Sequence, residues 1–151
     1  MSKTQQANNV IWYQNEIHIS RKRGSHIITK EVVGCVEKEL KNIKIGLCNV
    51  FLMHTSASLS INENYDPTVR IDIENSFNKM VPDGAQRYEH CLEGDDDAPA
   101  HIKSIMLGCS LNIPIQNGDL CLGTWQGIYL NEHRDNGGSR TIVVTINGTN
   151  K

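Results

Sequence analysis

The stretch Gly-Thr-Trp-Gln-Gly-Ile-Tyr-Leu-Asn-Glu-His-Arg, residues 123–134, decides the fold prediction because its side chains alternate as they would in a strand. One face would carry Trp125, Gly127, Tyr129, Asn131 and His133, and the other Gln126, Ile128, Leu130 and Glu132. The end of the strand offers a candidate acid, Glu132, a candidate base, His133, and Arg134, whose guanidinium fork suits a phosphate. The alternative is a structural strand whose charged end is solvated.

Further strands are expected on both sides of this segment. Turn-forming residues at 117–118, 123 and 135–138 separate predicted strands over 111–115, 120–122, 126–131 and 141–146. Upstream, the alternation of Ile17 and Ile19 predicts a strand over 12–20. The apolar segment 47–53 predicts another strand, which runs into 54–61 either as a strand pair or as one long bent strand.

Three helices are expected between these strands. The first begins at Thr29, carries Val32, Val33, Val36, Leu40 and Ile43 at helical spacing, and ends before Gly46. The second opens at Pro67 and has a buried stripe of Val69, Ile73, Phe77 and Met80. The third begins near Asp96 or Asp97, turns Ile102, Ile105 and Met106 inward and ends at Gly108. Because strands outnumber helices without regular βαβ units, the expected fold class is α+β with largely antiparallel sheet.

The bulk composition predicts one soluble domain in a reducing compartment. A chain of 151 residues suits a single domain, here expected over 11–149 behind a flexible polar tail at 1–10. The formal charge of −2 gives no electrostatic case for nucleic acid or an anionic membrane. Five scattered cysteines without a C-x-x-C pair favour free thiols, and no signal peptide or membrane-length apolar run is recognisable. A cytoplasmic location follows.

The most chemically dense segment is 88–101, with two histidines, His90 and His101, and five carboxylates within 14 residues. Imidazole nitrogens and carboxylate oxygens are ligands that zinc, manganese or a similar divalent ion accepts. The expected arrangement is a loop that brings His90 back to His101 on a helix start. The alternative is a solvated acidic loop with an N-capping aspartate.

A possible anion site is expected from more distant residues. Thr55 and Ser56 follow His54 at the end of an apolar strand and could donate hydroxyl hydrogen bonds to phosphate, although such residues are also ordinary on a polar strand face. Arg140 lies across the expected hairpin from Glu132, so that Arg140, helped by Lys103, could complete the site. The alternative is a rim salt bridge between Arg140 and Glu132.

A string of motifs in order resembles the secondary thiamine-phosphate synthase family, the YjbQ-like proteins, over about residues 11–149. The motifs are His54-Thr-Ser-Ala-Ser-Leu, Asn62-Glu-Asn64 with Asp66-Pro67, Glu93-Gly94-Asp95-Asp96, Ala100-His-Ile-Lys103, Gly123-Thr-Trp-Gln-Gly-Ile-Tyr-Leu and Glu132-His-Arg134 with Arg140. The resemblance implies an antiparallel β-sandwich with two to three helices, assembled as a homotrimer. It also implies that His54, His90 and His101 lie together as metal ligands, with Arg140 and Trp125-Gln126 around the same cleft.

The functional expectation is correspondingly broad. The resemblance implies a metal-dependent enzyme acting on a small phosphorylated metabolite, with weak thiamine-phosphate synthase activity and a divalent cofactor such as Zn, Mn or Mg. Where family members often have an acidic residue after the histidine at 90, this chain has Cys91. Two alternatives stay open: a metal-assisted hydrolase with Glu132 or His133 as base, and a non-catalytic module that binds a phosphometabolite or a metal.

Overall fold

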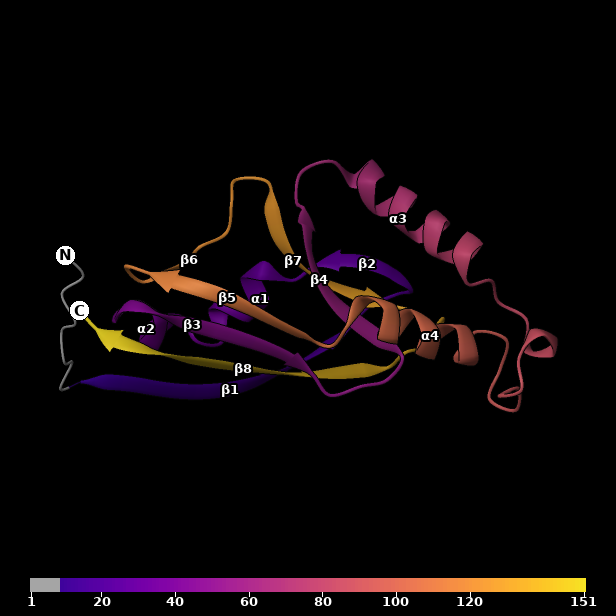
Figure 1. The fold of residues 1–151 in the computed structure, drawn as a ribbon, viewed down its shortest axis with the longest axis horizontal. Helices are drawn as coiled ribbons and strands as arrows, with labels where there is room; N and C mark the ends of the chain where they lie inside the picture. The colour runs from indigo at the N-terminus through magenta and orange to yellow at the C-terminus, as the bar shows by residue number, and fades with distance from the viewer. Residues whose placement is uncertain (1–8) are drawn as a thin grey trace.

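Two antiparallel sheets make up most of the computed structural model, which describes residues 9–151 (Figure 1). The larger sheet has the order β1-β8-β3-β5-β6 and the smaller has the order β2-β7-β4. The strands of the two sheets are β1 (Val10–Ser20), β2 (Gly24–Ile27), β3 (Ile43–Leu52), β4 (Ala57–Glu63), β5 (Ser110–Gln116), β6 (Asp119–Leu120), β7 (Gln126–Glu132) and β8 (Ser139–Asn150). The expected α+β class with mostly antiparallel sheet is confirmed.

The central strand of the smaller sheet is β7, the strand that the opening motif predicts. It pairs with β2 on one side and with β4 on the other, so its backbone groups are satisfied on both edges. Ile128 and Leu130 are fully buried and belong to the same hydrophobic core cluster as Val144 and Ile146 of β8. The opposite face carries Tyr129, Asn131 and His133, as the alternation requires.

The long strands β1 and β8 bring the two ends of the described chain together. Val10 pairs with Thr149, and the register continues without a break to Ser20 opposite Ser139. The first strand thus begins inside the tail expected at 1–10, and residues 1–8 of that tail lie outside the described residues. Within residues 9–151, none of the helices is both long and apolar enough to cross a bilayer.

The helix expected from Thr29 to Ile43 is wrong in its length. The chain forms two short helices instead, α1 (Thr29–Gly34) and α2 (Glu37–Leu40), and Ile43 already opens β3. The buried positions Val32, Val36 and Leu40 fit a helical period, but Ile43 also fits a strand. Its pairing with Asn150 at the end of β8 decides between them, because a β-branched residue suits that sheet position.

Strands β3 and β4 are neither a pair nor one bent strand. They belong to different sheets, and residues 53–56 cross from one sheet to the other. This crossover puts His54, Thr55 and Ser56 at the end of the molecule where β7 also ends, since Ala57 pairs with Glu132.

The helices α3 (Pro67–Met80) and α4 (Asp97–Leu107) lie away from the start of β1 and the end of β8, toward the opposite end of the molecule (Figure 1). A 3-10 turn, η1 (Ala85–Arg87), lies between them in the chain. The buried stripe expected on α3 is wrong for the single chain: Val69, Ile73 and Phe77 are only half-buried, and Met80 is exposed.

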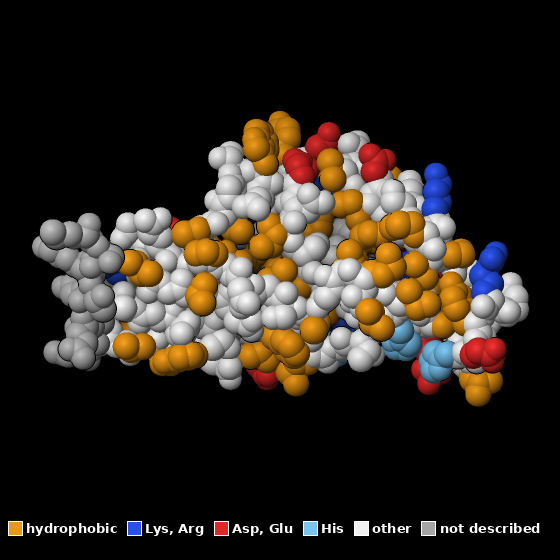
Figure 2. Space-filling model, in the orientation of Figure 1, with side chains coloured by type: hydrophobic (Ala, Val, Ile, Leu, Met, Phe, Trp, Pro, Cys, Tyr) orange, Lys and Arg blue, Asp and Glu red, His pale blue; other side chains and the backbone are white. Residues whose placement is uncertain are grey.

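The orientation of α4 also differs from the expectation. Its inward face carries Asp97, Lys103 and Ser104 together with small residues, whereas Ile102, Ile105 and Met106 point outward, with Ile105 85% exposed. The polar inward side chains find partners: Asp97 meets Arg134 and Lys103 meets Asn78. Figure 2 shows hydrophobic side chains gathered over this part of the surface, beside histidine side chains. An apolar helix face of this kind is typical of a contact surface.

Candidate metal centre

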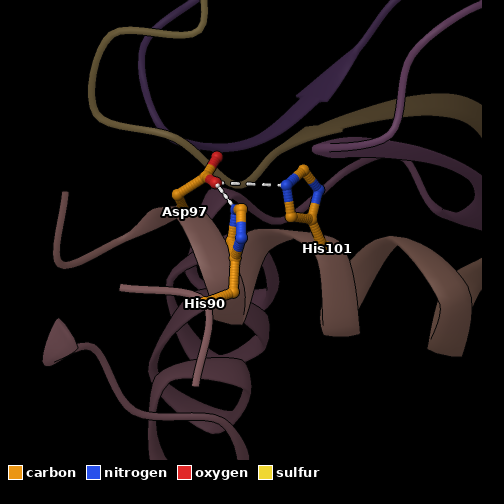
Figure 3. A group of neighbouring side chains, drawn as sticks. All are labelled: His90, Asp97 and His101. Atoms are coloured by element: carbon orange, nitrogen blue, oxygen red, sulfur yellow. Dashed lines mark hydrogen bonds and ion pairs between the residues drawn. The ribbon is translucent and has the colours of Figure 1, made fainter. Parts of the chain in front are cut away.

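Three side chains with metal-ligating atoms meet where the 88–96 loop enters α4. His90 Nε2 lies 2.6 Å from Asp97 Oδ2, and His101 Nε2 lies 3.2 Å from the same oxygen (Figure 3). Asp97 and His101 are one helical turn apart, so they project from the same face of α4. The loop then returns His90 to them, as the sequence predicts for this histidine pair. The three donor atoms lie within 4.8 Å of one another.

A hydrogen bond to the backbone shows that Nδ1 of His101 carries a proton. Its Nδ1 lies 2.8 Å from the carbonyl oxygen of Thr55, and a carbonyl only accepts, so Nδ1 carries a proton. In the neutral ring the lone pair of Nε2 then faces a carboxylate oxygen of Asp97, which is electrostatically unfavourable. Either a second proton on the ring or a cation between the two atoms removes that repulsion.

Arg134 holds Asp97 from the opposite side. Its Nη1 donates to Asp97 Oδ1, and its Nη2 donates to the carbonyl oxygen of Glu93 at 3.0 Å. Burial alone would raise the pKa of Asp97. The hydrogen bond from His90 and the neighbouring His101 and Arg134 side chains outweigh burial and lower this pKa. Asp97 is therefore an ionised carboxylate with one oxygen anchored and the other left for the histidines.

The solvent exposure of the three side chains increases from Asp97 through His101 to His90. The Asp97 side chain is 1% exposed, that of His101 is 35% exposed and that of His90 is 53% exposed. The group is therefore closed on the Asp97 side and open to solvent on the His90 side. Three protein ligands with an open side are the usual composition of a catalytic zinc site, whereas structural zinc sites have four ligands and are closed.

The spacing of the donor atoms suits one ion. Atoms bound to a single zinc at about 2.1 Å and near-tetrahedral angles lie roughly 3.4 Å apart. The 3.2 Å between His101 and Asp97 is close to that value, and the 2.6 Å between His90 and Asp97 would have to lengthen by less than about 1 Å. His90 lies on the exposed loop, where such a shift costs little packing. Two imidazoles also favour zinc or manganese over magnesium, which prefers oxygen ligands.

His54, which the resemblance adds to the ligands, lies outside this group of three. Its Nε2 accepts a hydrogen bond from the backbone N–H of Thr141 at 2.8 Å, so that lone pair is already used. Its Nδ1 lies 3.4 Å from Nη1 of Arg140. Burial and the charge of Arg140 lower the pKa of His54, against an opposing effect of Glu132. His54 is thus a neutral residue that supports the start of β8.

Glu132 and Arg140 form a buried bidentate ion pair. Arg140 Nε donates to Glu132 Oε1 at 2.7 Å, and Nη2 donates to Oε2 at 2.6 Å. Nη2 also contacts the hydroxyl and carbonyl oxygens of Ser56. Both charged side chains are at least 95% buried, so this is a pair in the interior rather than on the rim. Within the single chain the guanidinium fork expected for phosphate is occupied by Glu132.

His133 belongs to a separate buried network on the opposite face of β7. Its Nε2 lies 2.9 Å from the Ser58 hydroxyl, and the amide of Asn131 donates to Ser58 and to Ser60. Burial lowers the pKa of His133 to about 3, with the charges of Lys103, Arg23 and Arg140 acting in the same direction. The ring is therefore neutral at ordinary pH. Glu132 and His133 point to opposite faces of the strand and do not form one acid–base pair.

Comparison with known proteins now identifies the group of related chains. A family model described as "UPF0047 protein YjbQ-like" matches residues 14–149. This chain belongs to that family. The UPF0047 protein YjbQ of Salmonella typhimurium is 53% identical over 139 residues, which cover 91% of this chain and 99% of that protein. UPF0047 protein YugU of Bacillus subtilis is 36% identical over 80% of this chain and 87% of that protein.

Solved structures of YjbQ-like proteins share the fold. A crystal structure of a protein of unknown function from Sulfolobus solfataricus has a TM-score of 0.81 at 31% identity, and covers 93% of this chain and 99% of its own. An uncharacterised YjbQ/UPF0047 protein from Clostridium acetobutylicum has a TM-score of 0.74 at 37% identity, over 87% and 97% of the two chains. The resemblance in the motifs is thereby confirmed at the level of the family. The names of these relatives assign no activity.

The remaining expected site residues of this YjbQ-like chain are dispersed. Trp125 is exposed and packs edge-on against Tyr65, with ring centroids 5.6 Å apart, and Gln126 accepts from the Gly123 N–H at 2.8 Å. They open β7, whereas Glu132 ends it, and seven strand residues span roughly 20 Å. Within one chain, β7 thus separates this pair from the end of the strand where residues 54–56 lie.

Lys103, Thr55 and Ser56 have structural partners in this chain. Lys103 is buried, and its Nζ donates to Asn78 Oδ1 at 2.8 Å. Burial and the charge of Arg23 lower the pKa of Lys103, against nearby carboxylates. Thr55 contributes its carbonyl to His101, and Ser56 contributes oxygens to Arg140. Sequence reasoning did not single out Asp97 as a candidate ligand, although its spacing of four residues from His101 was a usable signal.

Proposed function

We propose that this YjbQ-like protein is a metal-dependent enzyme. Its ion binds at His90, Asp97 and His101 and coordinates a phosphate oxygen of a small-molecule substrate. The observation that carries the proposal is the geometry at His101. Its Nδ1 is fixed as a donor to Thr55, so in the neutral ring its Nε2 lone pair points at the ionised Asp97, an arrangement that a cation stabilises. The open side next to His90 leaves room for a substrate.

The arrangement of the arginines supports the ion, rather than a side chain, as the partner of the phosphate. Arg134 is engaged by Asp96, Asp97 and Glu93, and Arg140 by Glu132. The exposed segment 89–95, which contains His90, also carries Glu89, Glu93 and Asp95, whose charges repel an anion. A bound divalent ion would supply the positive charge that a phosphate oxygen requires there.

The metal-assisted hydrolase is less well supported. It needs a general base that reaches solvent, and the two expected bases, Glu132 and His133, are fully buried and occupied by Arg140 and Ser58. The thiamine-phosphate synthase reaction needs a site that binds a diphosphate and releases pyrophosphate. That requirement agrees with an ion in an otherwise acidic surface, so it is the first reaction to assay.

Metal analysis of protein purified without a histidine tag tests the binding site. We expect about one zinc or manganese per chain in the native protein and none in the double variant His90→Ala, His101→Ala. The matched control is His18→Ala, His26→Ala, which removes two histidines elsewhere and leaves the group intact. Equal metal content in both double variants, with the fold retained, would refute the site.

Turnover assays then separate the functional alternatives. The native protein is incubated with the pyrimidine diphosphate and the thiazole phosphate, and in parallel with a panel of phosphate esters, with and without a chelator. Chelator-sensitive pyrophosphate release supports the synthase reaction, and chelator-sensitive phosphate release supports hydrolysis. If phosphorylated compounds bind saturably but none of them is turned over, the protein is a binding module and the enzymatic proposal is overturned.

A further inference from the structure

Arg23, which lies in the turn between β1 and β2, contacts four polar side chains from three separate segments. Nη1 and Nη2 donate to the two oxygens of Asp83 at 2.6 and 3.0 Å. Nε donates to Glu74 at 3.1 Å, Nη2 to Asn78 at 2.7 Å, and Nη1 to Asp135 at 3.3 Å. The Arg23 side chain is 14% exposed, so these contacts are shielded from solvent. A planar fork with five donors is suited to holding several segments at once.

One of these segments leads to His90. Asp83 begins the loop that contains His90, and the next two residues attach that loop to the entrance of α4. Gly84 N–H donates to the carbonyl of Asp95 at 2.9 Å, and Ala85 N–H donates to the side chain of Asp95, also at 2.9 Å. The bidentate pair with Arg23 therefore fixes the base of the loop on which His90 is carried.

A second segment leads to Asp97. Asp135, which accepts from Arg23, donates its own backbone N–H to Asp96 Oδ2 at 2.8 Å. The neighbouring Arg134 donates to Asp97 itself. Arg23 therefore holds residues 134–135 through Asp135, and Arg134 in turn holds the carboxylate of Asp97.

The third segment leads to the helix that carries His101. Asn78 Oδ1 accepts from Arg23 Nη2 at 2.7 Å and from Lys103 Nζ at 2.8 Å. Lys103 lies on α4, two residues after His101, and is buried. One amide oxygen thus joins the turn that holds Arg23 to the helix that holds His101.

We infer that Arg23 is a positioning residue for the His90, Asp97 and His101 group, which it reaches through these three hydrogen-bonded routes. This inference rests on the proposed metal site, but it also makes a claim about the metal-free protein. Side chains that hydrogen-bond a metal ligand directly, as Arg134 would if Asp97 binds the ion, typically change metal affinity about tenfold to a hundredfold when they are removed, because they fix the orientation of the ligand. Arg23 acts on the same group through the segments that carry it.

The first test measures cobalt(II) binding by the absorbance of the bound ion. We expect Arg23→Gln to weaken cobalt affinity by roughly tenfold or more and to alter the absorption spectrum at saturation, because the ligands lose their fixed geometry. The control is Arg21→Gln, two residues away, which within residues 9–151 forms a more exposed ion pair with Glu31. A purely stabilising role for Arg23 would leave the spectrum of the saturated, folded protein unchanged, and that result would overturn the inference.

The second test uses the metal-free protein and separates the inference from the proposed function. Side-chain nitrogen resonances of the histidines are recorded by NMR for the native protein, Arg23→Gln and Arg21→Gln. We expect the His90 and His101 signals to shift only in Arg23→Gln. If they shift although the native protein binds no metal, the proposed function fails and the inference stands. If they do not shift, the inference fails whatever the metal does.

A milder variant covers the case in which Arg23→Gln does not fold. Asp83→Asn removes one charge from the best-formed contact of Arg23 at a position that is 36% exposed. We expect its His90 signal to shift more than its His101 signal, because Asp83 leads to the loop rather than to α4. Equal spectra of Asp83→Asn and the native protein would count against the route through the loop and hence against the inference.

Discussion

The buried pair of Glu132 and Arg140 makes Glu132→Gln the most informative stability variant. The change removes the negative charge and leaves the Arg140 guanidinium buried with Ser56 and an amide as its neighbours. One of its two bonds to the carboxylate would also face an NH2 group, which cannot accept. Removal of one partner of a buried pair typically costs about 3–5 kcal/mol, because an uncompensated charge stays in the interior.

This cost is large relative to the stability of a whole domain, which is typically about 5–15 kcal/mol. For a chain of this size it corresponds to a fall in melting temperature of roughly 6–20 °C. Gly137 leaves the space that the carboxylate fills, because a Cβ built there would lie 1.9 Å from Glu132 Oε1.

Urea unfolding at a fixed protein concentration measures the difference, with circular dichroism as the signal. The matched control is Glu31→Gln, which breaks the more exposed pair with Arg21 and should cost no more than about 1 kcal/mol. A Glu132→Gln variant within about 1 kcal/mol of the native protein would refute the argument from burial. Arg140 would then behave as the rim residue that the sequence allowed as an alternative.

Two further predictions concern acid stability and assembly. Because the pKa of His133 is about 3 in the folded chain and near 6.5 when unfolded, the unfolded state binds more protons between these values, so stability should fall as pH falls from about 6.5 toward 3. His133→Gln should flatten that part of a plot of unfolding free energy against pH, and an unchanged slope would contradict the prediction. Light scattering should report three chains per particle, as the family resemblance implies, and Ile105→Glu on the outward apolar face of α4 should reduce that number. A native protein that is monomeric at micromolar concentration would exclude the trimer.

Much of the fold was predictable because strand periodicity and turn chemistry are local properties. Residues 126–132 alternate between two buried faces, and Asn117-Gly118 turns the chain between β5 and β6, with positive φ at both residues. The helix starts were predictable for the same reason: Asp66 caps α3 by accepting from the Thr68 N–H at 2.9 Å, and Pro67 follows it. Long-range pairing set the ends instead, as at Ile43.

The candidate site was predictable in part. The density of ligating residues over 88–101 pointed to His90 and His101, and the structure brings them together. The spacing of Asp97 from His101 was a usable signal, but that His54 lies outside the candidate group depends on which lone pairs the fold has already used, and local patterns do not show this. The backbone N–H of Thr141 takes one from His54, whereas Arg134 holds one oxygen of Asp97 and leaves the other toward the histidines.

The sequence by itself determined most of the strands, the antiparallel class, the family and the pair of histidines, since each follows from local patterns or from motif order. The tertiary structure alone decided which charges are free and which are paired. Arg23, Arg134 and Arg140 all carry guanidinium groups that could bind an anion, and the carboxylates that these groups contact lie between 8 and 112 positions away along the chain. Only folding brings such partners within hydrogen-bond distance, and burial then makes the pair of Arg140 and Glu132 costly to break.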